Sequence, residues 1–278
     1  MPTLARPDGV EIHFEERGSG PLVVVVSYWS MHPSVYAPLT EELESDRRVV
    51  RYDDRGTGRS TRTEPYDLDT AAGDLEALVE HLGEPAVLVG TADGPARAIR
   101  VAAQRPDLIS GVVAIGGPPF GRAAFADSDT LAASEPVVQA LLSQVETDYR
   151  AAMRALVTAT NPQMSEDEVR QRVADQAEHC PVEAAAPRLR AWASDDARED
   201  SLAVGDRLWV IVSEAMAGGW FPAGAEMVGI VNRVLPEANV VDVEDGMVSR
   251  PDLSAAVIRG VPTAAVATAG DPNAVEAR

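Results

Sequence analysis

Apolar runs alternate along this chain with segments whose apolar residues recur at helical spacing. The run Leu22 to Val26 predicts a strand buried on both faces, whereas Leu68 to Leu82 has the period of an amphipathic helix that Gly83 ends. Further strands are expected at Val10 to Glu16, Arg48 to Tyr52, Ala86 to Val89, Leu108 to Gly116, Arg207 to Val212 and Val240 to Val243. Further helices are expected at Tyr36 to Leu43, Pro95 to Ala103, Ala223 to Leu235 and Leu253 to Ile258. This alternation predicts an α/β fold with a mainly parallel sheet covered by helices on both faces.

The strand pattern is interrupted by a stretch in which only helical periodicity remains. Short helices are expected there at Pro136 to Val145, Tyr149 to Val157, Glu166 to Ala177 and Ala184 to Trp192. Because ligands bind at the carboxyl edge of open α/β sheets, we interpret this stretch as a lid over that edge. The chain is therefore divided into a core, residues 1–119 and 196–278, and a helical lid, residues 120–195, with a loose tail after residue 262.

Acidic residues outnumber basic ones along the whole chain. The 278 residues hold 24 Lys and Arg against 44 Asp and Glu, which gives a formal net charge of −20. Such a charge repels nucleic acid and anionic membranes, so we expect neither as a partner. Cys180 is the one cysteine, the chain opens without an apolar signal core, and no apolar run approaches the roughly 20 residues of a membrane helix. These features predict a cytoplasmic protein.

Three motifs lie between the predicted elements. A buried run leads into Gly90-Thr91-Ala92-Asp93-Gly94, which resembles the nucleophile elbow, G-x-S-x-G, of the α/β-hydrolase family. Upstream, Asp53-Asp54-Arg55-Gly56-Thr57-Gly58-Arg59-Ser60 is similar to that family's D-x-R-G-x-G-x-S turn. Downstream, Arg105-Pro106-Asp107-Leu108-Ile109 is similar to its entry into the next strand. The resemblance covers nearly the whole chain and implies the α/β-hydrolase fold, with the helical stretch in the place of the family's cap.

The resemblance also implies a nucleophile, an acid and a histidine, in that chain order. Position 92 is alanine, whose methyl group cannot form an acyl-enzyme. Glu214 and Met216 stand in the region of the acid, and Met247 stands in the region of the histidine. The chain has only four histidines, which are His13, His32, His81 and His179. We therefore expect a family member that lacks the Ser–His–Asp triad.

Polar groups near the turn are the candidates for chemistry. Asp93 is expected to act as an acid or a base, because burial under a lid raises the pKa of a carboxyl group. Alternatively, the Asp93 side chain caps the helix that follows it. His32 is either a proton carrier or a surface histidine of its loop. Tyr28 offers a hydroxyl group and Trp29 a stacking face, unless one of the two packs in the core.

The rest of the expected pocket is apolar. A small apolar or amphipathic molecule is expected to contact Tyr28, Trp29, Ala92, Met216, Trp220 and Met247. The alternative is that the apolar side chains simply fill the pocket. The sequence has no metal-ligand spacing and no dinucleotide fingerprint, so we expect no metal and no cofactor. It leaves a homodimer open.

These features predict a protein that does not hydrolyse its ligand. We expect a repurposed acid–base or shape catalyst, such as a cyclase, isomerase or lyase, that acts on an apolar molecule of secondary metabolism. Asp93 would be its acid or base, and His32 or Tyr28 would assist. The alternative is a pseudohydrolase that binds a ligand or a partner protein without turnover. Because function belongs to the site rather than to the fold, the sequence leaves open whether the chain is an enzyme.

Overall fold

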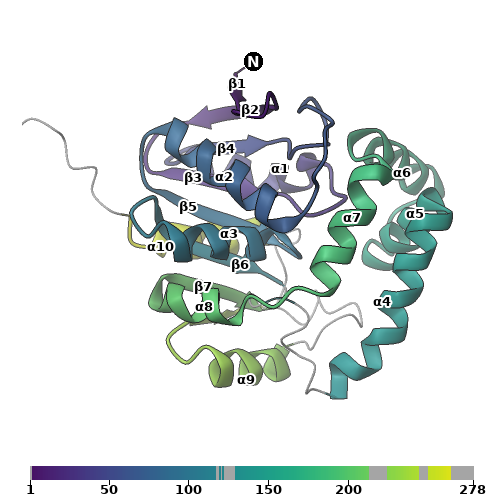
Figure 1. Cartoon of the computed structure of the whole chain (residues 1–278). Coiled ribbons are helices and arrows are strands. Elements are labelled where there is room, and N and C mark those ends of the chain that lie inside the picture. Colours follow the sequence, from purple (N-terminus) through teal and green to yellow (C-terminus); the bar gives the residue numbers. More distant parts are fainter. Residues whose placement is uncertain are drawn as a thin grey trace, which may run out of the picture.

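One eight-stranded sheet forms the centre of the protein, in a computed structural model that describes residues 2–116, 119, 121, 129–212, 224–243 and 250–263. The strand order is β1-β2-β4-β3-β5-β6-β7-β8, in which β2 runs antiparallel to both of its neighbours and all other pairs are parallel (Figure 1). The strands are β1 (Thr3–Ala5), β2 (Glu11–Gly18), β3 (Leu22–Val26), β4 (Arg48–Tyr52), β5 (Ala86–Thr91), β6 (Ile109–Ile115), β7 (Leu208–Val212) and β8 (Asn239–Asp242). The predicted mainly parallel sheet is confirmed.

Helices cover both faces of this sheet, as the alternating pattern predicts. On one face, α2, α3 and α9 contribute Leu75, Ile99 and Ile230 to a buried core. On the other face, α1 and α10 contribute Leu39 and Ile258. These helices, with α8 and the 3₁₀ turns, are η1 (Pro33–Tyr36), α1 (Ala37–Leu43), α2 (Leu68–Leu82), α3 (Gly94–Gln104), α8 (Arg198–Val204), η3 (Gly205–Arg207), α9 (Gly224–Val234) and α10 (Pro251–Gly260).

Helix α2 illustrates how closely local signals set the boundaries. It begins after Asp67, whose side chain accepts a hydrogen bond from the Thr70 backbone N–H at 2.7 Å. It ends at Gly83, which has a left-handed φ of 79°. Both boundaries agree with the sequence pattern, because cap, apolar face and stop signal all lie within one short segment.

Four further helices form a group beside the sheet, which we call the helical insert (Figure 1). They are α4 (Asp129–Thr147), α5 (Tyr149–Thr160), α6 (Glu166–His179) and α7 (Val182–Ala193). Their apolar side chains form a cluster of their own, which Trp29 and Tyr66 of the core join. Helix α6 starts with a capping box between Ser165 and Glu168. That the helical insert acts as a lid stays a prediction.

Some elements differ from the expectation. Helix α4 begins at Asp129 and continues through Pro136, the residue at which the sequence pattern predicts its start. Strand β1 and helix α8 have no counterpart in the pattern, because three residues are too few to display a period and α8 opens with the charged run Arg198-Glu199-Asp200, which gives it no apolar stripe. The expected loose tail after residue 262 lies outside the described residues from 264 onward.

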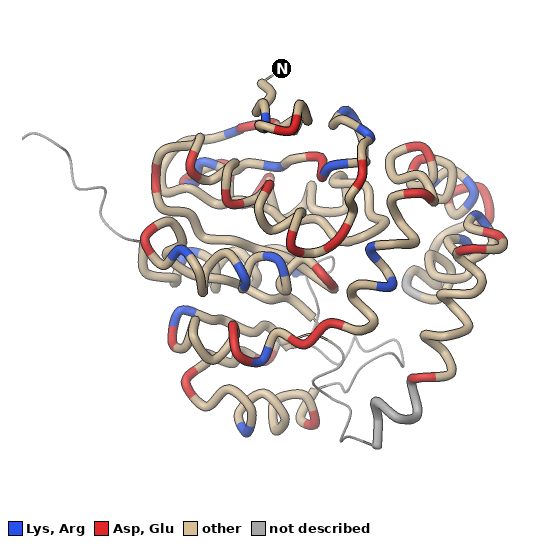
Figure 2. Tube along the Cα trace, viewed as in Figure 1, with Lys and Arg blue, Asp and Glu red and all other residues tan. Residues whose placement is uncertain are grey.

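Charged residues are spread over the core and the helical insert alike, without one dominant acidic segment (Figure 2). In the part of the chain that the structure describes, no helix combines the length and the apolar character needed to cross a membrane.

Candidate active site

The turn between β5 and α3 has the geometry of a nucleophile elbow. Ala92 has a φ of 52°, a left-handed conformation that costs a non-glycine residue about 1–3 kcal/mol. Gly94 then packs so closely on β3 that a Cβ atom there would lie 2.6 Å from the carbonyl oxygen of Val26. The turn therefore needs glycine at position 94, and it holds the Ala92 methyl group where the family's motif has its nucleophile.

Buried hydroxyl groups hold the strand end in place. The Tyr36 hydroxyl lies 2.8 Å from Thr91 Oγ1 and also donates a hydrogen bond to the carbonyl oxygen of Val26 at 3.4 Å. Tyr36 and Thr91 are both buried. Thr91 thus belongs to the packing beneath the turn, and it does not replace the missing nucleophile.

The carboxylate of Asp93 points inward, toward the protein. Its Oδ1 accepts a hydrogen bond from the Trp29 backbone N–H at 2.8 Å, and its Oδ2 lies 3.6 Å from Arg97 Nη2. The side chain is only 1% exposed and makes no capping hydrogen bond to α3, so the alternative of a helix cap is wrong. Burial raises the pKa of Asp93, against the opposing effect of Arg97. Its role as an acid or a base stays a prediction.

Arg97 is the centre of a buried network of charges beneath the turn. It donates to Asp54 Oδ1 at 2.6 Å and to the carbonyl oxygen of Ser27. Arg188 of α7 lies 3.5 Å from Asp54 Oδ2 and donates to the carbonyl oxygen of Arg55 at 2.5 Å. Burial raises the pKa of Asp54, but Arg97 and Arg188 outweigh it and hold that pKa below its usual value. The helical insert is thereby tied to the turn by charge.

The loop after β3 lies between the turn and the helical insert. Trp29 is buried there and Tyr28 is half-buried, and both pack against the apolar cluster of the insert. The Cys180 thiol donates to the carbonyl oxygen of Trp29 at 3.1 Å, so it is engaged in packing. The predicted residues Tyr28, Trp29, Ala92 and Asp93 therefore belong to one neighbourhood.

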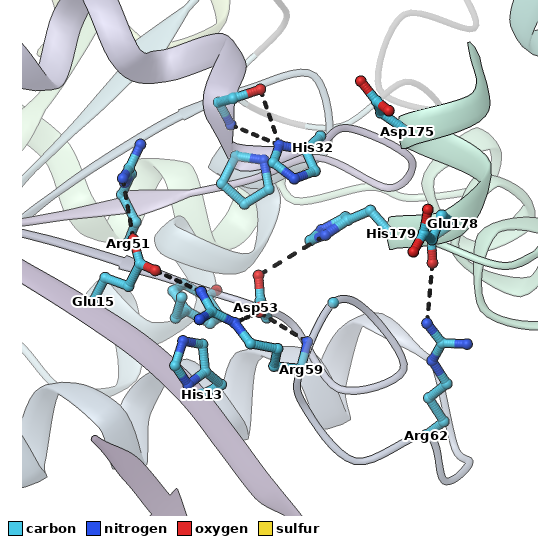
Figure 3. A pocket seen from close by; sticks show the side chains of 14 residues that line it. His13, Glu15, His32, Arg51, Asp53, Arg59, Arg62, Asp175, Glu178 and His179 are labelled. Atoms are coloured by element: carbon cyan, nitrogen blue, oxygen red, sulfur yellow. Dashed lines mark hydrogen bonds and ion pairs between the residues drawn. The ribbon is translucent and has the colours of Figure 1, made fainter. Parts of the chain in front are cut away.

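His32 lies elsewhere, at a polar cavity of about 540 Å³ beside α6 (Figure 3). Its ring meets the ring of His179 edge to face, with centroids 4.8 Å apart, and His179 Nδ1 lies 4.0 Å from Asp53 Oδ1. Among the described residues, no hydrogen bond or ion pair joins His32 to Asp93. His13, to which the sequence pattern assigns no role, is buried and lines the same cavity.

Part of the expected pocket cannot be placed. Met216, Trp220 and Met247 lie outside the described residues, as does Glu214. Within the described ranges, no cluster of three or more His, Cys, Asp or Glu side chains could hold a metal ion.

A comparison against known families agrees with this fold. A model of the alpha/beta hydrolase family matches residues 19–259, so the chain belongs to that family. It is similar to 2-(acetamidomethylene)succinate hydrolase of Mesorhizobium japonicum, with 30% identity over 165 residues, 59% of this chain and 57% of that protein. It is also similar to pimeloyl-(acyl-carrier protein) methyl ester esterase of Methylococcus capsulatus, with 31% identity over 108 residues, 39% of this chain and 41% of that protein. The matches thus span 57% and 41% of these relatives' lengths.

A solved structure supports the fold over a longer stretch. The crystal structure of E-2-(acetamidomethylene)succinate hydrolase superimposes with a TM-score of 0.70 at 21% identity. The superposition covers 93% of this chain and 98% of that one.

These relatives overturn the prediction of a non-hydrolytic protein. They are named as a hydrolase and an esterase, and neither name is that of a cyclase, an isomerase, a lyase or a binding protein. The predictions of a repurposed catalyst of secondary metabolism and of a pseudohydrolase were therefore wrong. They rested on the alanine at position 92 together with the lack of the usual acid and histidine in the regions of Met216 and Met247, and they took the loss of the triad as the loss of the reaction.

Proposed function

We propose that this chain hydrolyses a small carboxylic ester or amide at the turn after β5, with water as the nucleophile. The observation that carries the proposal is the left-handed Ala92 on a turn packed against β3 through Gly94. The family and the names of the relatives support hydrolysis, and those names contain an acetamido group and a methyl ester. The methyl group at position 92 favours a member that works without the Ser–His–Asp triad.

In the proposed reaction, backbone N–H groups stabilise the charge that develops on the substrate. The first N–H groups of a helix have no partner within the helix, and α3 begins at Gly94, two residues after Ala92. Because Pro95 has no N–H, the donors closest to Ala92 are the backbone N–H groups of Asp93 and Gly94. Water attacks the carbonyl carbon, the C=O electron pair moves to the oxygen, and these N–H groups bind the resulting oxyanion. Collapse of the intermediate then breaks the bond to the alcohol or amine, and the proton released by the water passes to that leaving group.

Asp93 receives a positioning role in this proposal. Its carboxylate fixes the Trp29 N–H, and it thereby holds the loop after β3 against the turn. The burial of the carboxylate argues for this role rather than for contact with the substrate. In serine hydrolases stripped of a triad member, the oxyanion site and binding alone still give about 10³–10⁴-fold catalysis over water. An acceleration of that order is expected here.

The test measures hydrolysis of p-nitrophenyl acetate and p-nitroacetanilide against buffer alone. We expect product to form at a steady rate without an initial burst. The intact mass of the protein should show no covalent adduct with a fluorophosphonate probe. An adduct would point to a side-chain nucleophile, and rates equal to buffer over a panel of small esters and amides would refute hydrolysis.

Two substitutions at one position separate the roles of Asp93. Asp93→Asn keeps an oxygen that can accept the Trp29 N–H, so it should retain most of the rate, whereas Asp93→Ala should lose it. If Asp93 were instead a general base, both variants would lose the rate equally. Asp252→Asn, in an exposed ion pair with Arg250, serves as the matched control, and circular dichroism checks that each variant is folded.

A further inference from the structure

The polar cavity beside α6 is separate from the turn. Its wall is formed by side chains of β2, β4, the loop 53–62, the loop after β3 and the C-terminal half of α6 (Figure 3). Among the described residues, none of the turn 91–94 lines it. The volume of about 540 Å³ lies in the range of ligand pockets, which is roughly 300–1,000 Å³. The cavity therefore has room for a molecule of its own.

The wall excludes an apolar ligand. Ten of the 14 lining residues are Asp, Glu, Arg or His. An apolar molecule would remove water from these groups without replacing its hydrogen bonds, which is unfavourable. A ligand of this cavity must therefore carry polar or charged groups of its own.

Charges on the inner wall already have partners within the protein. Glu15 accepts hydrogen bonds from both Arg51 at 3.2 Å and Arg59 at 2.5 Å. Asp53 accepts from the Arg59 backbone N–H at 3.0 Å. This wall is thus a fixed and largely neutralised surface, and it does not favour a ligand of one sign.

The outer wall differs, because its charges form no ion pair with any residue that the structure describes. Arg62 donates to the carbonyl oxygen of Glu178 at 3.0 Å, and Asp175 accepts from Gln171 at 2.7 Å. Within the described parts of the chain, no ion pair is formed by Arg62, Asp175 or Glu178, which we call the cavity mouth. All three residues are exposed and line the same cavity. The cavity mouth therefore offers one cation and two anions to a ligand.

The two histidines between these walls offer further hydrogen-bonding groups. His32 Nδ1 accepts from the Ser34 backbone N–H at 3.1 Å, so the neutral ring carries its proton on Nε2. Burial lowers the pKa of His179 to about 4, so the His179 ring is neutral near pH 7. Neutral imidazoles both donate and accept, which suits the amide or hydroxyl groups of a ligand.

We propose that this cavity binds a small dipolar molecule of the amino-acid or dipeptide class. Its carboxylate group pairs with Arg62, and its ammonium group pairs with Asp175 and Glu178. The inference does not depend on the proposed hydrolysis, because it rests on the cavity alone and its test measures binding.

Isothermal titration calorimetry with three probes of similar size tests the charge pattern. Glycylglycine carries both charges, N-acetylglycine only the negative one, and glycine N-methylamide only the positive one. Glycylglycine should bind about tenfold more tightly than either, because each exposed charge contact adds a modest amount of affinity. Undetectable binding of glycylglycine, or equal binding of all three probes, would overturn the proposal.

Substitutions locate the binding and assign each charge. Arg62→Gln should lower the affinity for glycylglycine to that of the cationic probe, and the double variant Asp175→Asn/Glu178→Gln should lower it to that of the anionic probe. Arg190→Gln is the matched control, since Arg190 is also exposed but pairs with Glu146 on the helical insert, outside the cavity wall. Unchanged binding in the cavity-mouth variants would place the ligand elsewhere and refute the site.

Discussion

The charge network beneath the turn after β5 and the cavity mouth both combine arginine with acidic side chains, but they differ in how those charges are solvated. Beneath the turn, Arg97 and Asp93 are each 1% exposed, Asp54 is 4% exposed, and they lie in one network with Arg188. At the cavity mouth, Arg62 and Glu178 lie at the surface. A buried charge is held by its partners and sets structure, whereas an exposed charge stays available to a ligand at little cost.

The largest expected effect comes from breaking the buried network. Arg97→Met should lower the free energy of unfolding by about 3–5 kcal/mol, because it leaves Asp54 and Asp93 buried without a central cation. Urea denaturation followed by circular dichroism measures this loss.

The variant Arg105→Met is the matched control. Arg105 forms three ion pairs at the surface, with Glu76, Glu80 and Asp107, so its loss should change the midpoint of urea denaturation little. Equal losses in both variants would contradict the comparison.

An intermediate effect is expected at His179, which is mostly buried yet lines the cavity. Burial lowers its pKa from 6.5 to about 4, against the opposing effect of Asp53, and His32 lowers it further. Between pH 6.5 and 4, the His179 side chain therefore binds a proton in the unfolded chain but not in the folded chain. The contribution of His179 to the free energy of unfolding is fully present above pH 6.5. It is lost as the pH falls toward 4, by up to about 3 kcal/mol.

The His179→Gln variant isolates this contribution. Its free energy of unfolding should depend less steeply on pH than that of the wild type between pH 6.5 and 4, and urea titrations at several pH values measure the difference. His81→Gln, on the exposed side of α2, is the control and should keep the wild-type slope. Parallel pH curves for wild type and His179→Gln would show that the histidine is not buried in solution.

The smallest expected effect concerns the backbone of the turn. Ala92→Gly should raise the free energy of unfolding by about 1 kcal/mol, because glycine adopts a φ of 52° without the strain that alanine bears. Ala102→Gly, within α3, should instead lower it by about 1 kcal/mol or more. Thermal unfolding of the two variants gives the opposite signs directly. A loss in both would mean that the turn is not left-handed.

Much of the fold could be predicted from the sequence, because its signals are local. The run Leu22 to Val26 and the capped helix Leu68 to Leu82 each show their type within one segment. The turn at Gly90 to Gly94 could be located for the same reason, because its two glycines, which the close approach of β3 requires, lie within one short motif. The role of the Asp93 side chain was harder to predict, because its partners Trp29 and Arg97 are brought to it only by tertiary contacts.

The cavity beside α6 could not be predicted, because no segment of the sequence contains it. His13 comes from β2, His32 from the loop after β3, and His179 from the end of α6. Their convergence depends on how the helical insert packs on the loop that contains Asp53, and periodicity carries no information about that packing. In the sequence, His13, His32 and His179 lie in different segments, and nothing indicates that they share a site.

The left-handed alanine also has a consequence for the history of the chain. Alanine and serine codons of the type GCN and UCN differ by a single base, so one point mutation would place a hydroxyl group on the Cβ atom that Ala92 already presents. The backbone that such a serine requires is in place, strained and supported by Gly94. In evolutionary terms, the turn is one base change away from the G-x-S-x-G motif, and laboratory selection could explore that step without rebuilding the scaffold.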